Sequence, residues 1–164
     1  MGVNCKCVEK DKIKMRRRVQ MIRRTMEYEA LVDLFVRSRL EISPEDPCPE
    51  GLITCFEMFD DKSGRRIGAS GLCCDHGEYV LRCVAVEEGL RGNGYGTQLV
   101  RAVIDEAERL GAKKLWLTAK VPQFYKRFGF QVVSRKEAPF VTKCVECPQY
   151  HNGCDSEVMV LYMS

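Results

Sequence analysis

The sequence of 164 residues has no long apolar segment. No stretch approaches the roughly 18 consecutive apolar residues that a membrane span needs, and no apolar run follows the basic first residues as in a secretory signal peptide. Lys6 stands where a myristoylation signal that begins at Gly2 requires Ser or Thr. We therefore expect a cytoplasmic protein with no membrane partner.

The chain also lacks internal repeats, low-complexity segments and any linker rich in glycine, serine or proline. Apolar residues make up 45% of it and charged residues 30%, a composition typical of folded globular proteins rather than disordered ones. Its length fits one domain with a core of its own. We expect a polar lead-in over residues 1–12 and a single domain over residues 13–164.

Acidic residues are scarce at the start of the chain. Residues 1–24 contain nine Lys or Arg and two acidic residues, a net charge of +7, whereas the remaining residues have a net charge of −4. Such a basic segment can bind a polyanion or simply be solvated. No aromatic residue that could stack on bases precedes Tyr28, so we expect no nucleic-acid partner.

Cysteine is plentiful, with ten residues in the chain. Without a secretory signal, the thiols are expected to stay reduced. Cys55, Cys73, Cys74 and Cys83 lie within apolar runs, where a free thiol behaves as a small hydrophobic group. These four cysteines are therefore predicted to be part of the core.

A second group of thiols differs because it is close to a histidine in a polar segment, the loop over residues 144–154. This group consists of Cys144, Cys147, His151 and Cys154. Three thiolates and an imidazole form a tetrahedral zinc site, and Cys-x2-Cys is its usual half-site, although His-x2-Cys is tighter than common zinc patterns. Cys5 and Cys7 could add a ligand, and an iron–sulfur centre would use similar thiols. The alternative is a thiol-rich loop that packs or responds to oxidation.

Hydrophobic periodicity predicts strands and helices in an order that implies a mixed α/β fold with helices on both faces of one sheet. Residues 52–59, 67–74 and 79–86 are predicted to form an antiparallel meander. The other predicted elements are a strand at 13–22, a helix capped by Thr25 and ending near Leu40, a helix that follows Gly96 and ends at Gly111, a strand at 114–119, a short helix at 124–128, and strands at 130–133 and 156–163.

Glycines are concentrated between the predicted strand at 79–86 and the helix that follows. A strand, a glycine-rich loop and a helix N-terminus together form an anion site, because backbone N–H groups and the helix dipole point at the ligand. The loop lacks the Gly-Lys-Ser/Thr of nucleotide triphosphatases. Its glycines are spaced Gly-x-Gly-x-Gly rather than Gly-x-Gly-x-x-Gly, and Lys120 follows the next strand where a dinucleotide site requires an acidic residue.

Two motifs resemble those of the GNAT acetyltransferase superfamily over residues 13–163. Arg91-Gly92-Asn93-Gly94-Tyr95-Gly96 matches its Arg/Gln-x-x-Gly-x-Gly/Ala signature, and residues 124–130, FYKRFGF, resemble its second marker, a short helix that carries Tyr and ends in Gly-Phe. Residues 117–139 are also similar to amino-acid N-acetyltransferases such as N-acetylglutamate synthases. The resemblance implies a mostly antiparallel central sheet with splayed middle strands.

The resemblance further implies an acetyl-CoA cosubstrate. The backbone of Val84, Ala85 and Val86 would bind the pantetheine arm. The pyrophosphate would be bound by Arg91, Gly92, Asn93, Gly94, Tyr95, Gly96 and Thr97. Asn93 and Lys126 are further candidates for cofactor contacts, and a homodimer is an open alternative because such dimers are common in the superfamily.

The implied reaction is direct attack of a neutral primary amine, from a small molecule or an amino acid, on the thioester. Tyr125 is the candidate general acid for the departing sulfur, and the alternative is a tyrosine that packs on the cofactor. The general base stays unassigned among Glu57, Glu87, Glu88 and a chain of waters. The competing hypothesis is a non-catalytic CoA-binding or metal-responsive module that uses the cysteine loop.

Overall fold

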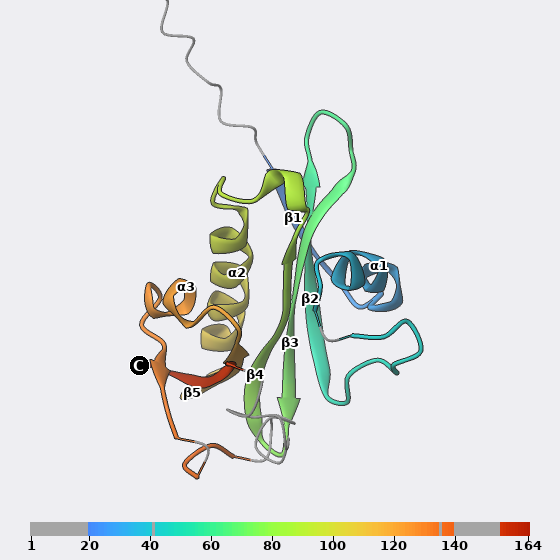
Figure 1. The fold of residues 1–164 in the computed structure, drawn as a ribbon. Coiled ribbons are helices and arrows are strands. Elements are labelled where there is room, and N and C mark those ends of the chain that lie inside the picture. The colour runs from blue at the N-terminus through green and yellow to red at the C-terminus, as the bar shows by residue number, and fades with distance from the viewer. Residues whose placement is uncertain (1–19, 41, 135, 140–154) are drawn as a thin grey trace, which may run out of the picture.

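A computed structural model describes residues 20–40, 42–134, 136–139 and 155–164. Its centre is a seven-stranded sheet of order β1-β2-β3-β4-β5-β7-β6, with helices on both faces (Figure 1). The strands are β1 (Gln20–Thr25), β2 (Leu52–Asp60), β3 (Arg66–Asp75), β4 (Glu78–Val86), β5 (Lys114–Ala119), β6 (Gln131–Val132) and β7 (Glu157–Tyr162). The helices are α1 (Glu29–Arg37), α2 (Tyr95–Arg109), α3 (Pro122–Lys126) and the 3-10 turn η1 (Glu88–Leu90).

Strands β1 to β4 form the antiparallel meander that the sequence predicts. The turn between β3 and β4 has two residues, His76 at φ 49° and Gly77 at φ 80°. Positive φ at both positions matches the right-handed twist of the flanking strands, and glycine adopts it without steric cost. The tight turn fixes the register in which Asp75 lies opposite Glu78.

Two helices bury opposite faces of this meander. Helix α2 packs its apolar side, including Leu99 and Val103, against β2, β3 and β4, while α1 buries Leu31, Leu34 and Phe35 on the other face (Figure 1). Each such side chain stabilises the fold by about 1.5–3 kcal/mol when fully buried. Because both faces are covered, β2 and β3 are buried along most of their length.

The predicted start of the first helix is wrong. Thr25 is not its cap but the last residue of β1, where it lies opposite Cys55, and α1 begins at Glu29. The Thr25 hydroxyl instead accepts a hydrogen bond from the Glu27 amide at 3.1 Å, in the turn between strand and helix. Strand pairing therefore prevails over the local capping preference. The described part of the predicted strand at 13–22 begins at Gln20.

The sheet continues beyond β4 through β5, which is parallel to β4, and β7, which is antiparallel to β5. The short β6 pairs with β7 at the far edge. None of the helices in the described part of the chain is long and apolar enough to cross a bilayer.

Candidate active site

Strands β4 and β5 are paired only at their beginnings. Tyr79 lies opposite Leu115 and Val80 opposite Trp116, and beyond these pairs the two strands separate. A cavity of about 810 Å³ opens in the gap. The edge of β4 that follows Val80 borders this cavity, and its backbone N–H and C=O groups need partners there. The expected splay of the middle strands is confirmed.

A β-bulge shapes the cavity side of β4. Ala69 of β3 lies opposite Ala85, but Gly71 lies opposite Arg82, so Ser70 faces two β4 residues, Cys83 and Val84. Cys83 has φ 61°, a left-handed conformation that side chains other than glycine rarely adopt. Such a bulge bends its strand and redirects the residues that follow. It thereby separates the paired start of β4 from the segment Val84–Val86 beside the glycine loop.

The glycine loop ends at the start of α2. Gly92 has φ 82° and Gly94 has φ 79°, and a Cβ atom at either position would meet open space. Gln98 donates the first helical hydrogen bond, to the carbonyl of Gly94 at 3.2 Å. The amides of the first turn have no acceptor within the helix and point out of its end, where the helix dipole favours an anion. This arrangement can hold a phosphate group.

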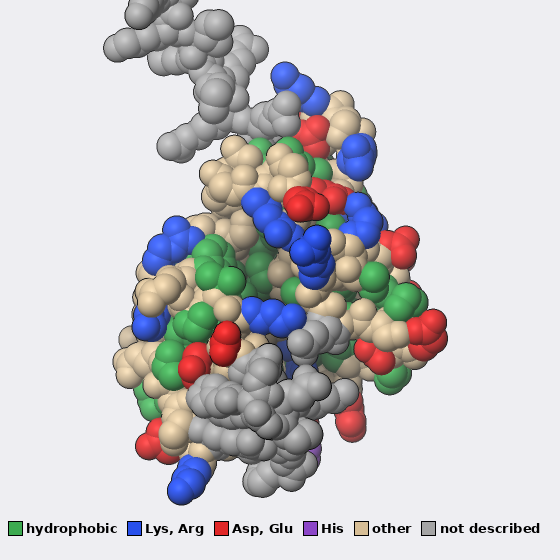
Figure 2. All heavy atoms as spheres, in the orientation of Figure 1, with side chains coloured by type: hydrophobic (Ala, Val, Ile, Leu, Met, Phe, Trp, Pro, Cys, Tyr) green, Lys and Arg blue, Asp and Glu red, His purple; other side chains and the backbone are tan. Residues whose placement is uncertain are grey.

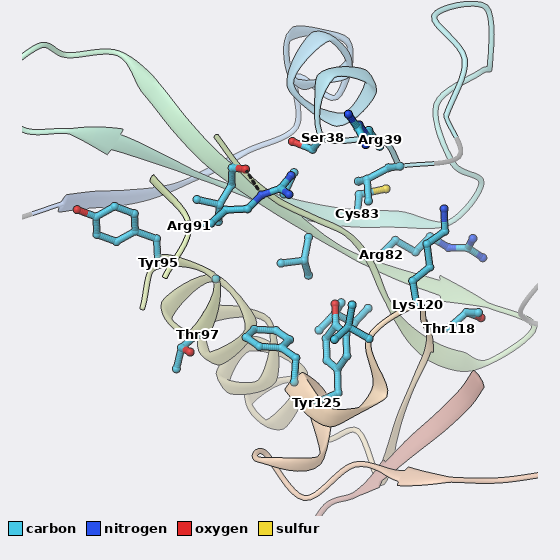
Figure 3. Close-up of a pocket in the computed structure, with 18 of the residues that line it drawn as sticks. Ser38, Arg39, Arg82, Cys83, Arg91, Tyr95, Thr97, Thr118, Lys120 and Tyr125 are labelled. Carbon is cyan, nitrogen blue, oxygen red and sulfur yellow. Dashed lines mark hydrogen bonds between the residues drawn. The ribbon is translucent and has the colours of Figure 1, made fainter. Parts of the chain in front are cut away.

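Arg91 fastens the loop to β4. Its Nε donates a hydrogen bond to the Val86 carbonyl at 3.4 Å, and its guanidinium borders the cavity (Figure 3). Most of the cofactor-binding residues predicted from the sequence also line this cavity, namely Val84, Ala85, Val86, Arg91, Gly92, Gly94, Tyr95, Gly96 and Thr97. Asn93 is the exception: its side-chain amide donates to the Leu90 carbonyl at 2.9 Å. The ring of Tyr95 is buried and points away from the cavity (Figure 3).

Residues 53–132 match the family model for the acetyltransferase (GNAT) domain. Over these residues, just under half of its length, the chain is similar to GNAT acetyltransferase domains. The glycine loop, the splayed strands and the short helix of Tyr125 all lie within the matched residues.

Solved structures share this fold at low identity. N-acetylglutamate synthase from Neisseria gonorrhoeae, complexed with coenzyme A and N-acetyl-glutamate, superposes with a TM-score of 0.70 and 19% identity. The match covers 89% of this chain and 35% of that chain, so the chain spans about a third of that relative's length. A Mycobacterium tuberculosis protein in complex with CoA gives a TM-score of 0.69 at 18% identity, covering 88% and 99% of the two chains.

A third relative acts on a protein. The ribosomal-protein-S18-alanine N-acetyltransferase from Escherichia coli has a TM-score of 0.63 and 19% identity, with 89% of this chain and 95% of that chain covered. The predicted GNAT fold, a mostly antiparallel sheet with helices on both faces, is confirmed.

Tyr125 lies on α3 and lines the same cavity as the glycine loop. Its ring packs edge-on against Phe124 at 4.9 Å and Phe130 at 6.0 Å between centroids, and its hydroxyl points into the cavity (Figure 3). Burial raises the pKa of Tyr125 to about 12, with a smaller contribution from Cys83. The phenol is therefore protonated at neutral pH and can donate a hydrogen bond.

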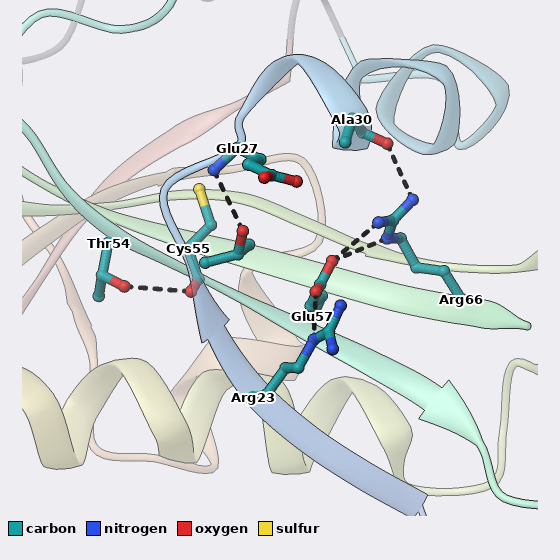
Figure 4. A network of polar contacts seen from close by, with 8 residues as sticks. Arg23, Glu27, Ala30, Thr54, Cys55, Glu57 and Arg66 are labelled. Atoms are coloured by element: carbon teal, nitrogen blue, oxygen red, sulfur yellow. Dashed lines mark hydrogen bonds and ion pairs between the residues drawn. The ribbon is translucent and has the colours of Figure 1, made fainter. Parts of the chain in front are cut away.

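None of the three acidic candidates for the general base lines the cavity. Glu57 is buried in β2 between two arginines, with Arg23 Nε at 2.6 Å and Arg66 Nη2 at 2.9 Å (Figure 4). Glu87 pairs with Arg37 at 2.5 Å, and Glu88 lies in η1. Lys126, the other weakly supported cofactor contact, is exposed and does not line the cavity either.

The cavity wall is positively charged. Among the described residues that line it, none is Asp or Glu, whereas the basic ones are Arg39, Arg82, Arg91, Lys120 and Arg127. Of these, only Arg91 was predicted from the sequence as a site residue. Arg39 and Lys120 follow α1 and β5, which are far apart in the chain, so no local pattern could have grouped them. Figure 2 shows basic side chains around the middle of the face viewed, between the regions of α1 and α2.

The four cysteines that lie within apolar runs are buried or half-buried, largely as predicted. Cys55 and Cys73 are buried, and Cys74 and Cys83 are half-buried. Cys144, Cys147, His151 and Cys154 lie outside the described residues, so the proposed metal site is a prediction from the sequence only. Within the described ranges, no group of three or more His, Cys, Asp or Glu side chains could hold a metal ion.

Proposed function

We propose that this GNAT domain transfers the acetyl group of acetyl-CoA to the primary amine of a small molecule or an amino acid, by direct attack in a ternary complex. One observation carries the proposal: the glycine loop, the free edge of β4 and the Tyr125 hydroxyl all border one cavity. Its volume is within the range of small-molecule and cofactor sites. CoA in the Neisseria and Mycobacterium relatives gives this assignment further support.

The cosubstrate would lie along β4 and across the end of α2. Backbone groups of Val84, Ala85 and Val86 would hydrogen-bond the pantetheine arm as a neighbouring strand does. The amides of residues 91–97 would bind the pyrophosphate, aided by the dipole of α2. Gly96 faces Phe124, and a Cβ atom there would lie 3.4 Å from its ring, so this glycine keeps the helix end close to α3.

The chemical step forms a C–N bond and breaks the C–S bond. The neutral amine attacks the thioester carbon, and a backbone amide of β4 stabilises the negative charge on the carbonyl oxygen. The electron pair of the broken bond passes to sulfur, to which Tyr125 donates a hydrogen bond. Because the pKa of Tyr125 is raised, this hydroxyl stabilises the developing thiolate and completes the proton transfer only as the product leaves. The proton of the amine passes to water.

The test is acetyl transfer to a panel of primary amines, with the acetylated product identified by mass spectrometry. Acetylation of at least one amine that depends on both acetyl-CoA and the enzyme supports the proposal. Tight binding of acetyl-CoA without acetylation of any amine would overturn it and leave a non-catalytic CoA-binding protein.

A further inference from the structure

The cavity has a cationic end as well as a cofactor end. Arg39 follows α1, Arg82 lies on β4, and Lys120 follows β5, and all three line the wall. Arg82 is four residues before Val86, on the other side of the β-bulge from the segment that leads into the glycine loop. Figure 3 shows Arg82 and Lys120 on the opposite side of Tyr125 from Tyr95 and Thr97. This end of the cavity is where a second substrate would meet the acetyl group.

Arg39 is held at the cavity wall by the way in which α1 ends. The Leu40 amide donates to the Phe35 carbonyl at 3.2 Å, and the Arg39 amide donates to the Val36 carbonyl at 3.1 Å. These two bonds form a Schellman motif, in which the residue at the position of Arg39 is left-handed and usually glycine. Arg39 has φ 59°. An arginine thus occupies a position where glycine would adopt the left-handed conformation at lower steric cost.

The side chain of Arg39 does not compensate for this conformation. Among the residues that the structure describes, its guanidinium has no hydrogen-bond or ion-pair partner, and the residue is exposed. Residues in sparsely populated conformations are concentrated at ligand sites. The guanidinium of Arg39 is therefore accessible to a ligand that enters the cavity.

The other two basic residues reinforce the positive field. Arg82 pairs with Asp75, with 3.9 Å between Nη2 and Oδ2, and Asp75 does not line the cavity. Lys120 follows β5, and Thr118 of that strand also lines the cavity (Figure 3). Three cations with no carboxylate among the described lining residues would repel a polyamine and attract an anion.

We propose that Arg39, Arg82 and Lys120 form a carboxylate-binding subsite, so that the acceptor is an amine that also carries a carboxylate, such as an amino acid. This proposal rests on the proposed acetyl transfer and narrows its acceptor. Arginine binds a carboxylate through two parallel hydrogen bonds, which would orient the amine of the same molecule toward the thioester. Arg39 is then the residue that selects the acceptor.

The experiment compares matched acceptors in wild type and variants. L-Leucine and L-glutamate are assayed against leucinamide and spermidine, with kcat and KM measured for each and for acetyl-CoA. Wild type should prefer the free acids by about tenfold or more in kcat/KM, the effect of one charge-assisted contact. Arg39→Gly should raise the KM for the acids about tenfold and leave the KM for leucinamide and for acetyl-CoA unchanged. It should keep or raise the Tm, because glycine suits the left-handed backbone.

Arg37→Gln is the matched control, since Arg37 lies two residues earlier and does not line the cavity. It should leave the acid preference intact. The inference is overturned if the kcat/KM for leucinamide or spermidine equals that for the acids. It is equally overturned if Arg39→Gly lowers the affinity for acetyl-CoA and not the affinity for the acids, because the cations would then bind a cofactor phosphate.

Binding separates this inference from the proposed function. Calorimetry of L-glutamate and of its diamide on the enzyme–CoA complex needs no turnover. If Arg39→Gly weakens the binding of glutamate, the carboxylate subsite is supported. This holds even if no amine is acetylated, and in that case only the proposed acetyl transfer fails. Equal binding of glutamate and its diamide overturns the subsite even if transfer occurs.

Discussion

Val80 and Trp116 form the second of the two pairs that join β4 to β5, and the strands diverge directly beyond them. The Trp116 indole also donates to the Glu78 carboxylate at 2.9 Å, which anchors the paired end of the gap. The cavity therefore begins at a defined point of the sheet and widens toward the glycine loop. The proposed acetyl transfer depends on that divergence, because paired strands would leave no backbone edge for a ligand.

Tyr125→Phe should lower kcat about 100-fold and leave the affinity for acetyl-CoA unchanged. The hydroxyl acts on the leaving sulfur, and contributions of this kind are typically 10²–10⁴-fold. The phenyl ring preserves the packing on Phe124 and Phe130. Steady-state kinetics and calorimetry measure the two effects.

Tyr162→Phe is the control for this change, since Tyr162 is an exposed tyrosine on β7, outside the cavity. An unchanged kcat in Tyr125→Phe would favour the alternative in which Tyr125 only packs on the cofactor. Wild-type kcat should not decline between pH 8 and 10 through ionisation of Tyr125, because its raised pKa keeps the phenol protonated there.

Arg91→Gln should lower the affinity for acetyl-CoA about tenfold, since one charge-assisted contact near the pyrophosphate is lost. The loop also loses its tie to the Val86 carbonyl. Arg101→Gln, on the exposed side of α2, should have no effect on cofactor affinity. Titration calorimetry at two salt concentrations tests both variants, and a smaller salt dependence is expected for Arg91→Gln alone. Equal affinities for Arg91→Gln and wild type would exclude the arginine from the cofactor site.

Glu106→Gln should destabilise the fold by about 1–2 kcal/mol, less than for a fully buried ion pair because both partner arginines are largely exposed. Glu106 is buried on α2 and accepts hydrogen bonds from Arg109 at 2.7 and 2.9 Å and from Arg24 of β1. The hydrogen bond from Arg109, and then the charges of both arginines, lower the pKa of Glu106 despite its burial. Urea unfolding at neutral pH measures the loss.

The pH dependence of Glu106→Gln gives an independent check. Since the native pKa is below the unfolded value, the stabilisation is fully present above the ordinary pKa of Glu and is lost as pH falls from there through the lower native pKa. The difference between wild type and Glu106→Gln should therefore shrink from pH 6 to pH 3. A difference that stays constant over this range would mean that the carboxylate charge is irrelevant.

Alkaline pH should destabilise the native state. Burial raises the pKa of Cys55 and of Cys83 to about 12 and that of Cys73 to about 11, so the native state keeps protons that the unfolded chain loses. Stability is therefore complete below the ordinary thiol pKa and falls as pH rises, by about 1.4 kcal/mol per pH unit for each affected group. Urea unfolding from pH 8 to 10.5 should show a shallower slope for Cys73→Ala than for wild type.

Much of the fold is predictable because its signals are local. The apolar spacing of α2 and the turn residues between β2, β3 and β4 give these elements to within a residue or two. Glu106 was missed because it lies one heptad after Leu99, on the buried side, and one of the two arginines that compensate its burial, Arg24, comes from a distant strand. Thr25 was misassigned because its pairing with Cys55 is not visible in the local sequence.

The candidate site was predictable where it depends on one continuous segment. The loop from Arg91 to Thr97 carries its own signature, and Tyr125 lies in a second short motif. The bulge at Cys83 and the left-handed Arg39 could not be predicted, because each places a residue other than glycine at positive φ. Both depend on strand register and helix termination, which emerge only when the chain is folded.

The most direct test of the account is titration of acetyl-CoA into wild type, Gly94→Trp and Gly111→Trp. Gly94 and Gly111 have φ 79° and 81° and open space around them, so both substitutions carry similar backbone strain at opposite ends of α2. If the glycine loop holds the cofactor, wild type and Gly111→Trp bind acetyl-CoA and Gly94→Trp does not. Absence of binding to folded wild type, or equal binding by the two variants, would contradict the account.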